Sequence, residues 1–146
     1  MDNQAPIGMP EPEGIRAQLV TLRDALLRLH KSLVDSERVE YERTMGPIRS
    51  PQEFLRLLST DPWFAWLAPL TQLLVSIDEA VDAQEPLTVA SVKAMLSRTF
   101  QLLVTEENGD GFGKEYFEAL QRDPDVVMAH AEVAKLRRTI KTDRVE

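Results

Sequence analysis

The most constraining feature of the sequence is a run without charged residues from Pro62 to Ile77, which contains both tryptophans of the chain. Asp61 can accept hydrogen bonds from the free N–H groups of a helix start, and proline fits the first helical position. The run therefore predicts a helix that starts at Pro62 and is covered by other helices around nearly its whole circumference. Pro69 should kink this helix, because proline removes one backbone hydrogen bond.

The same run is shorter than the roughly 18 to 20 apolar residues that cross a bilayer. It also includes two prolines and the polar residues Thr71, Gln72 and Ser76. We therefore expect a core helix and no membrane span.

A length of 146 residues suits one domain with one core. The absence of cysteine excludes disulfides, thiol nucleophiles and cysteine-ligated metals. The first residues show neither the basic nor the apolar segment of a secretory signal, so we expect a cytoplasmic protein. With 17 basic and 24 acidic residues the net charge is −7, which argues against nucleic acid as a partner.

Basic residues gather near the end of the chain. We expect them to complement the negative end of the last helix, and a basic docking patch is the alternative. They are Lys135, Arg137, Arg138, Lys141 and Arg144.

A long first helix is predicted from Glu13 to about Thr44, ending at Gly46-Pro47. Its leucines recur at heptad spacing and form a seam for a neighbouring helix at a shallow crossing angle. A second stripe beside the seam widens the buried face enough for a bundle. The seam contains Ile15, Leu19, Leu22, Leu26, Leu29 and Leu33, and the second stripe Val20, Leu27, Val34 and Tyr41.

Capping signals predict the later helices. A capping box at Ser50 to Glu53 begins a short helix, and Thr88 caps a longer one that should stop at Asn108-Gly109. A short helix with Tyr116, Phe117 and Leu120 follows, and Asp123-Pro124 begins the last helix. We expect one face of the last helix to be buried, formed by Val127, Ala131 and Ala134.

These patterns predict an all-α fold and no strand. The expected architecture is an antiparallel bundle of about four main helices, with a long first helix, a kinked tryptophan-bearing second helix and short connecting helices. Residues 1–12 should form a flexible N-terminal arm, residues 13–140 a single helical domain and residues 141–146 a tail.

Several short motifs resemble a family of short, uncharacterised bacterial all-helical proteins. They are Leu29-His30-Lys31, Glu37-Arg38, Tyr41-Glu42, the segment from Asp61 to Leu67, Ile77-Asp78-Glu79 and the segment from Asp123 to Val126. The resemblance implies a cytoplasmic bacterial protein and supplies no activity, cofactor or functional residue.

The segment from Glu106 to Phe117 resembles the first half of an EF-hand calcium loop, with Glu106, Asn108 and Asp110 at the first, third and fifth positions. Position nine is Lys114, and position twelve, which should hold a bidentate glutamate, is Phe117. We therefore expect no metal site here.

His30 and His130 are the only histidines, and the Glu-x-x-His pairs of a di-iron bundle are absent. We expect each histidine to be partly buried and hydrogen-bonded to a neighbour. Both stay candidates for acid–base work, because their unperturbed pKa lies near neutrality.

The far end of the first helix is the candidate binding site. Continuing the seam places Glu40 where leucines stand earlier, with Glu37 and Tyr41 beside it. A closed end would require an arginine to neutralise a buried carboxylate, whereas an open end would form a polar cleft. We expect Glu40 to be partly buried and paired with an arginine such as Arg49, Arg56 or Arg98.

Two functions are compatible with the sequence. We favour a noncatalytic helical interaction module that self-associates or joins a larger assembly, with no cofactor, because no catalytic motif is present. The alternative is a small-molecule- or metal-binding bundle, with or without enzymatic activity. It would use His30, Glu37, Glu40 and Tyr41 around a polar cleft near the tryptophans.

Overall fold

The computed structural model describes the backbone of residues 10–145 and the side chains of residues 10–139. Most of the expected N-terminal arm, residues 1–9, lies outside the described residues. The part that is described is helical and has no strand, which confirms the all-α prediction. Its elements are α1 (Ile15–Met45), α2 (Pro51–Thr60), the 3₁₀ helix η1 (Pro62–Leu67), α3 (Ala68–Asp82), α4 (Val89–Leu102), α5 (Phe112–Arg122) and α6 (Pro124–Val145).

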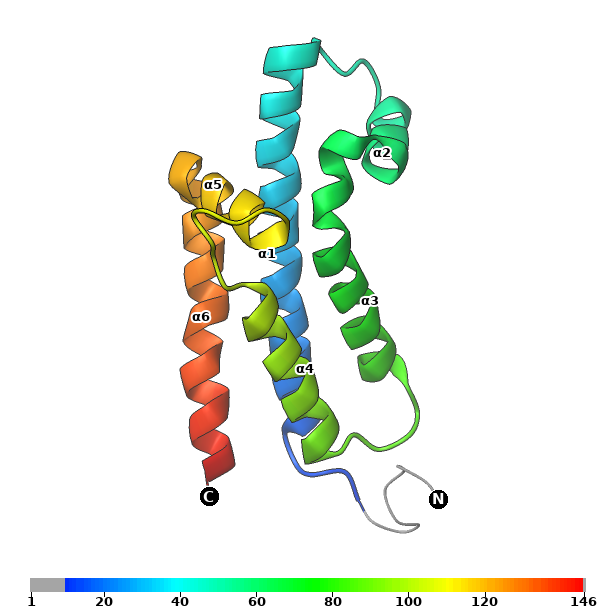
Figure 1. The fold of residues 1–146 in the computed structure, drawn as a ribbon. Coiled ribbons are helices and arrows are strands. Elements are labelled where there is room, and N and C mark those ends of the chain that lie inside the picture. Colours follow the sequence, from blue (N-terminus) through cyan, green and yellow to red (C-terminus); the bar gives the residue numbers. More distant parts are fainter. Residues whose placement is uncertain (1–9, 146) are drawn as a thin grey trace.

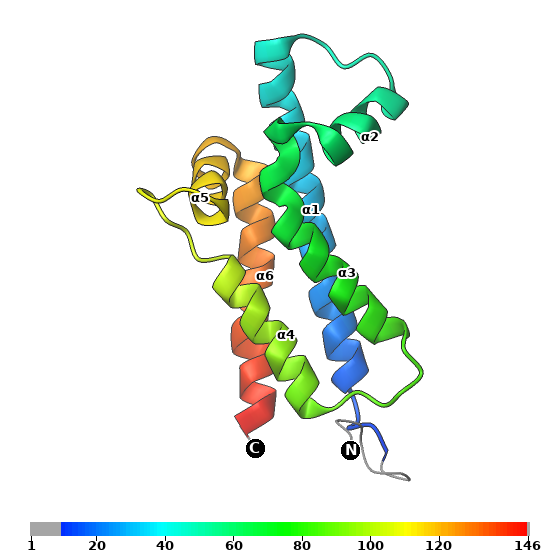
Figure 2. The ribbon, with the colours of Figure 1, turned by 45° about the vertical axis from the view of Figure 1, so that its right-hand side comes forward.

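The longest helix, α1, is the one on which the others are arranged (Figure 1). It packs against α3, α4 and α6, and these four helices run in alternating directions along the chain (Figures 1 and 2). The short helices α2 and α5 lie toward the far end of α1. The chain therefore enters α1 and ends α6 at the same end of the molecule.

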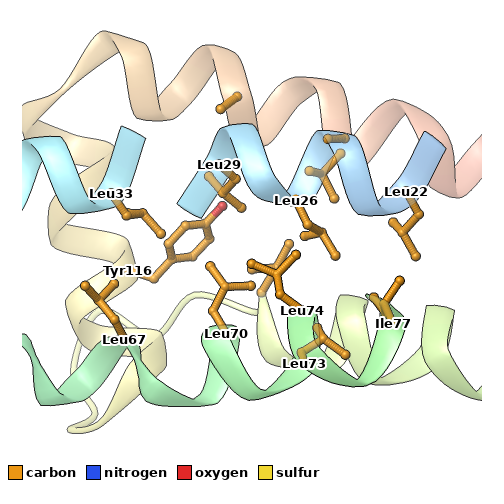
Figure 3. Close-up of a cluster of buried hydrophobic side chains, with 14 of the residues drawn as sticks. Leu22, Leu26, Leu29, Leu33, Leu67, Leu70, Leu73, Leu74, Ile77 and Tyr116 are labelled. Atoms are coloured by element: carbon orange, nitrogen blue, oxygen red, sulfur yellow. The ribbon is translucent and has the colours of Figure 1, made fainter. Parts of the chain in front are cut away.

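The leucine seam of α1 forms the centre of the core. All six of its predicted residues are buried, and α3 supplies the facing layer with Leu70, Leu73, Leu74 and Ile77. Figure 3 shows the Tyr116 ring of α5 inserted between these two layers near Leu33 and Leu67. In the second stripe, Val20, Val34 and Tyr41 are half-buried and Leu27 is exposed, so that stripe is only partly covered.

The caps agree with the sequence signals. Ser50 Oγ accepts from the Glu53 N–H at 3.0 Å, and Thr88 Oγ1 accepts from the Ser91 N–H at 3.1 Å. Gly46 ends α1 with a backbone φ of 99°, a conformation that residues with a Cβ atom rarely adopt. The chain can therefore reverse sharply there toward α2.

The tryptophan-bearing segment is two helices rather than one. Asp61 caps it through a 2.8 Å bond from the Trp63 N–H, as expected, but residues 62–67 are 3₁₀ and the α-helix begins at Ala68. Pro69 therefore lies in the first turn of α3, where its missing N–H leaves no helical bond unmade. The interruption that we attributed to proline is a change of helix type.

The expectation that this segment is covered on nearly all sides is wrong. Among the described residues, the stretch Pro62–Asp82 is long and apolar enough to cross a membrane by length and composition alone, and 33% of its most apolar part is buried. Ala65, Ala68 and Val75 are exposed. Because one side of α3 packs on α1 and α4, the absence of charge leaves an apolar surface on the other side.

Helix α4 ends earlier than predicted. Its last residue is Leu102, and Asn108-Gly109 lies in the following loop. The Leu103 side chain is buried, whereas Thr105 and the next polar residues offer no apolar face to bury. The loop then folds back, with the Glu106 N–H donating to the Gly113 carbonyl at 3.2 Å.

Helix α6 buries a different face from the one that we predicted. Val126, Ala129 and Val133 are buried, whereas Val127, Ala131 and Ala134 are exposed. Both sets recur at helical spacing, so periodicity alone does not choose between them. Packing against α1 and α5 selects the set that also turns His130 toward Tyr116.

We predict that Phe64→Ala destabilises the protein by about 3 to 5 kcal/mol, the usual cost of removing a buried large aromatic side chain. Phe64 is 2% exposed, and its ring contacts those of Tyr41 and Phe54. Denaturant unfolding measures the change. Leu55→Ala, at an exposed position of α2, is the control and should cost below about 1 kcal/mol.

Candidate functional site

The candidate site at the end of α1 is organised around the buried carboxylate of Glu37. Glu37 is 5% exposed. Its Oε1 accepts from the Trp63 indole Nε1 at 2.9 Å, and its Oε2 accepts from Arg122 Nη2. Arg122 Nε also donates to Ser36 Oγ at 3.1 Å. One carboxylate therefore joins α1, η1 and α5.

Glu40 lies at the rim of this cluster. Its side chain is 31% exposed and accepts from Arg43 Nη1 at 2.9 Å, with Arg122 Nε at 3.9 Å. The partly buried, arginine-paired carboxylate that we expected is thus present, but its partners are Arg43 and Arg122. The three arginines proposed from the sequence, Arg49, Arg56 and Arg98, are not the ones that it meets in the described structure.

Tyr41 faces the aromatic side of the cluster. Its ring lies 5.5 Å from Trp63, edge to face, and 5.5 Å from Phe64. Aromatic pairs at these separations stabilise beyond the area that they bury. The phenol ring therefore helps to place the Trp63 indole that donates to Glu37.

The surroundings of the cluster are rich in acidic groups. On α5, burial raises the pKa of Glu115, and the neighbouring carboxylates of Glu118 and Glu37 raise it further, against the opposing effect of Arg122 and Lys114. Arg122 therefore pairs with Glu37 and also offsets part of the repulsion that raises the pKa of Glu115.

His30 is separated from this cluster by two turns of α1, about 10 Å along the helix axis. Its Nε2 lies 3.0 Å from Thr71 Oγ1 of α3, and burial lowers its pKa. It lines a groove of about 690 Å3 between α1, η1, α3 and the end of α2. We call this the α1–α3 groove, and its lining includes Val34, Leu58, Ala65, Ala68 and Thr71.

The structure thus brings Glu37, Glu40 and Tyr41 together and places His30 apart from them. Arg122 and Trp63 complete the cluster. The sequence placed the tryptophans near the candidate cleft but predicted neither the hydrogen bond of Trp63 nor the involvement of Arg122. A general signal existed for Trp63, because a buried indole N–H needs an acceptor. No local signal pointed to Arg122, which is 85 residues from Glu37 in the chain.

A second polar pair involves His130. Both histidines are partly buried and hydrogen-bonded to a neighbour, as expected, but the sequence named neither partner. The Tyr116 hydroxyl lies 2.6 Å from Nδ1 of His130, and the tyrosine is fully buried. Burial raises the pKa of Tyr116 and lowers that of His130. A protonated phenol and a neutral imidazole therefore fit, with the hydroxyl as donor to Nδ1.

The described residues contain no cluster of three or more His, Asp or Glu side chains able to hold a metal ion. In the segment that resembles a calcium loop, Lys114 Nζ donates to the Glu107 carbonyl at 3.1 Å and pairs with Glu118 at 3.2 Å. A lysine ammonium in this position competes with a cation for the same oxygens.

Comparisons of the chain with protein-family models, with curated proteins and with solved structures found no match. The resemblance to short bacterial helical proteins therefore stays a prediction.

We predict that Glu37→Gln destabilises the protein by about 2 to 3 kcal/mol, because it removes the charge that Arg122 requires in a mostly buried setting. This loss of stability is smaller than that expected for a fully buried ion pair, because the Arg122 side chain is 28% exposed. Glu40→Gln is the matched control and should cost under about 1 kcal/mol. Equal costs measured by urea unfolding for the two variants would contradict the assignment.

We also predict that the free energy of unfolding decreases as the pH falls from 7 through about 6.5, the pKa of histidine in the unfolded chain. His30 and His130 have lowered pKa values in the folded state, so the unfolded chain binds protons first. The variant His30→Gln/His130→Asn should reduce the change of unfolding free energy with pH. Each amide side chain can accept or donate a hydrogen bond as the imidazole does, but it does not bind a proton in this pH range. Thermal unfolding between pH 7 and 5.5 tests this; an unchanged slope would exclude the histidines as its source.

Proposed function

We propose that the protein is a noncatalytic helical interaction module and that the α1–α3 groove receives an amphipathic helix of a protein partner. In this proposal α1, α3, α4 and α6 act as one antiparallel four-helix bundle that carries the groove. The cytoplasmic location and the lack of a nucleic-acid partner, both expected from the sequence, are part of the same proposal.

The observation that carries the proposal is the uncovered apolar side of η1 and α3. Ala65 and Ala68 are exposed along the groove, which Val34 of α1 and Leu58 of α2 also line. Helix-in-groove recognition uses such a channel between helices, with apolar anchors one to two turns apart on the incoming helix.

The apolar surface continues beyond the groove. Arg23 pairs with Asp78 at 3.1 Å, and His30 contacts Thr71 at 3.0 Å, which fixes how α1 and α3 lie against each other. Leu27 lies between Arg23 and His30 on α1, and Val75 lies between Thr71 and Asp78 on α3. Leu27 and Val75 are both about half-exposed, so they add apolar surface about one turn beyond the groove.

The polar residues that follow the groove along α1 support a noncatalytic role. The carboxylate of Glu37 is engaged by Trp63 and Arg122, and Glu40 is engaged by Arg43. A general acid or base must have a proton-transfer atom within reach of a substrate. Both carboxylates are instead held by arginines, and that of Glu37 links α1 to η1 and α5.

The alternative, a small-molecule-binding bundle, is favoured by one observation. The α1–α3 groove has a volume of about 690 Å3, within the range of ligand pockets, and His30 lies on its wall. A ligand would use the apolar lining for affinity and the imidazole for orientation.

Site-specific photocrosslinking separates these functions. A photoreactive side chain at Ala65 or Ala68 of the full chain, expressed in bacteria, should give a discrete protein adduct. The same group at exposed Arg98 of α4 should not. Val34→Glu, which places a charge in the groove, should abolish the adduct while the purified variant remains folded.

Native mass spectrometry of the protein purified without added metal tests the alternative. A stoichiometric small molecule that Val34→Glu releases, together with no adduct at Ala65 or Ala68, would favour the ligand-binding bundle. Flotation with lipid vesicles that Val34→Glu prevents would contradict both readings and favour a membrane surface.

A further inference from the structure

Helix α6 carries an uncovered stripe on the side away from the core. Val127 and Met128 are 45% and 70% exposed, and Ala131 and Ala134 are exposed as well. The buried residues of α6 lie on its other side, against α1 and α5. Figure 1 shows α6 at the edge of the described part of the molecule, with α5 beside its first turns. The end of α5 borders Val127 and Met128, and both side chains stay exposed.

The charges of α6 are segregated along its length. The half before Lys135 carries the acidic residues Asp125 and Glu132 and no lysine or arginine. From Lys135 to Val145 the helix carries five basic residues and one acidic residue, Asp143. Cations complement the C-terminal end of a helix dipole, which accounts for part of this pattern. The dipole does not account for the apolar stripe on the same helix.

We propose that two copies of the protein associate through their α6 helices in antiparallel orientation. In this arrangement the acidic half of each helix faces the basic half of the other, whereas a parallel pair would oppose like charges. The contact is the same on both copies, so it closes as a twofold dimer and does not propagate. The occupant of the stripe is therefore a second copy of this chain.

The centre of α6 suits such a contact. Ala131 and Ala134 lie near its midpoint, where small side chains let two helix backbones approach closely. Met128 lies toward one end, and its flexible side chain adapts to an irregular surface. The helix is about 33 Å long at 1.5 Å per residue, so the charged halves lie well apart from the twofold axis.

Two existing contacts of α6 bear on this pairing. Glu132 accepts a hydrogen bond from Arg28 at 2.9 Å, and each of the two side chains is more than half exposed. Solvent therefore already reaches this ion pair. Arg137 lies over the Phe100 ring at 5.1 Å and belongs to the contact with α4. Arg137 is therefore not substituted in the variants that test the pairing.

Charge exchange between two variants tests the orientation. Lys135→Glu/Arg138→Glu removes the net positive charge of the second half of α6 while its first half stays acidic. Asp125→Lys/Glu132→Lys makes both halves basic. Each variant alone should be monomeric in sedimentation velocity at concentrations where the wild-type chain is dimeric. Mixed together, they should form a heterodimer, which native mass spectrometry recognises by its mass.

The matched control is Lys93→Glu/Arg98→Glu, which reverses the same number of charges on exposed positions of α4. It should dimerise as the wild-type chain does. Circular dichroism establishes that each variant is helical before the assembly is measured. Rising salt should weaken the wild-type dimer, because exposed charges are screened.

Three results would overturn the proposal. They are a wild-type chain that stays monomeric over the whole concentration range, an acidic variant that dimerises like the wild type, and two folded variants that do not combine. The inference concerns α6 alone, so its failure would leave the α1–α3 groove proposal standing, and crosslinking at Ala65 reports on that groove separately.

Discussion

The unbroken apolar seam of α1 is the constraint on which the rest of the structure depends. Because the seam has heptad spacing, neighbouring helices can follow it at a shallow angle over its whole length. Helices α3, α4 and α6 all contact α1. A central helix with several neighbours covers only the inner side of each one, so α3 and α6 keep uncovered outer sides. That geometry explains why an uncharged run such as Pro62 to Ile77 is not enclosed.

The buried cluster around Glu37 shows what happens where the seam ends. After Leu33 the buried line continues through Ser36 and Glu37, so a carboxylate enters the space between helices. Burying it is tolerated only with partners, and Trp63 and Arg122 provide them. Physical reasoning from the sequence required an arginine at this end. Its identity depended on where α5 packs, which no local pattern contains.

Local signals were enough to predict the helix starts at Pro51, Pro62 and Val89 and the end at Gly46, because each depends on residues within about four positions. The end of α4 and the buried face of α6 were not predictable in this way. In α6 the set Val126, Ala129 and Val133 competes with Val127, Ala131 and Ala134, and both are apolar at helical spacing. Contact with α1 and the Tyr116–His130 pair decide between them. The outward pairing of His30 with Thr71 likewise follows from the alignment of α1 with α3.

The two uncovered surfaces lie on opposite sides of α1, since α3 and α6 flank it (Figure 1). They also differ in chemistry. The α1–α3 groove is mainly apolar, so binding there would depend little on salt, whereas pairing along α6 would depend on charge. Occupying one surface does not block the other. A dimer joined along α6 would therefore carry two α1–α3 grooves directed away from each other, and a partner that offered two helices could bind both with an affinity above that of either groove alone.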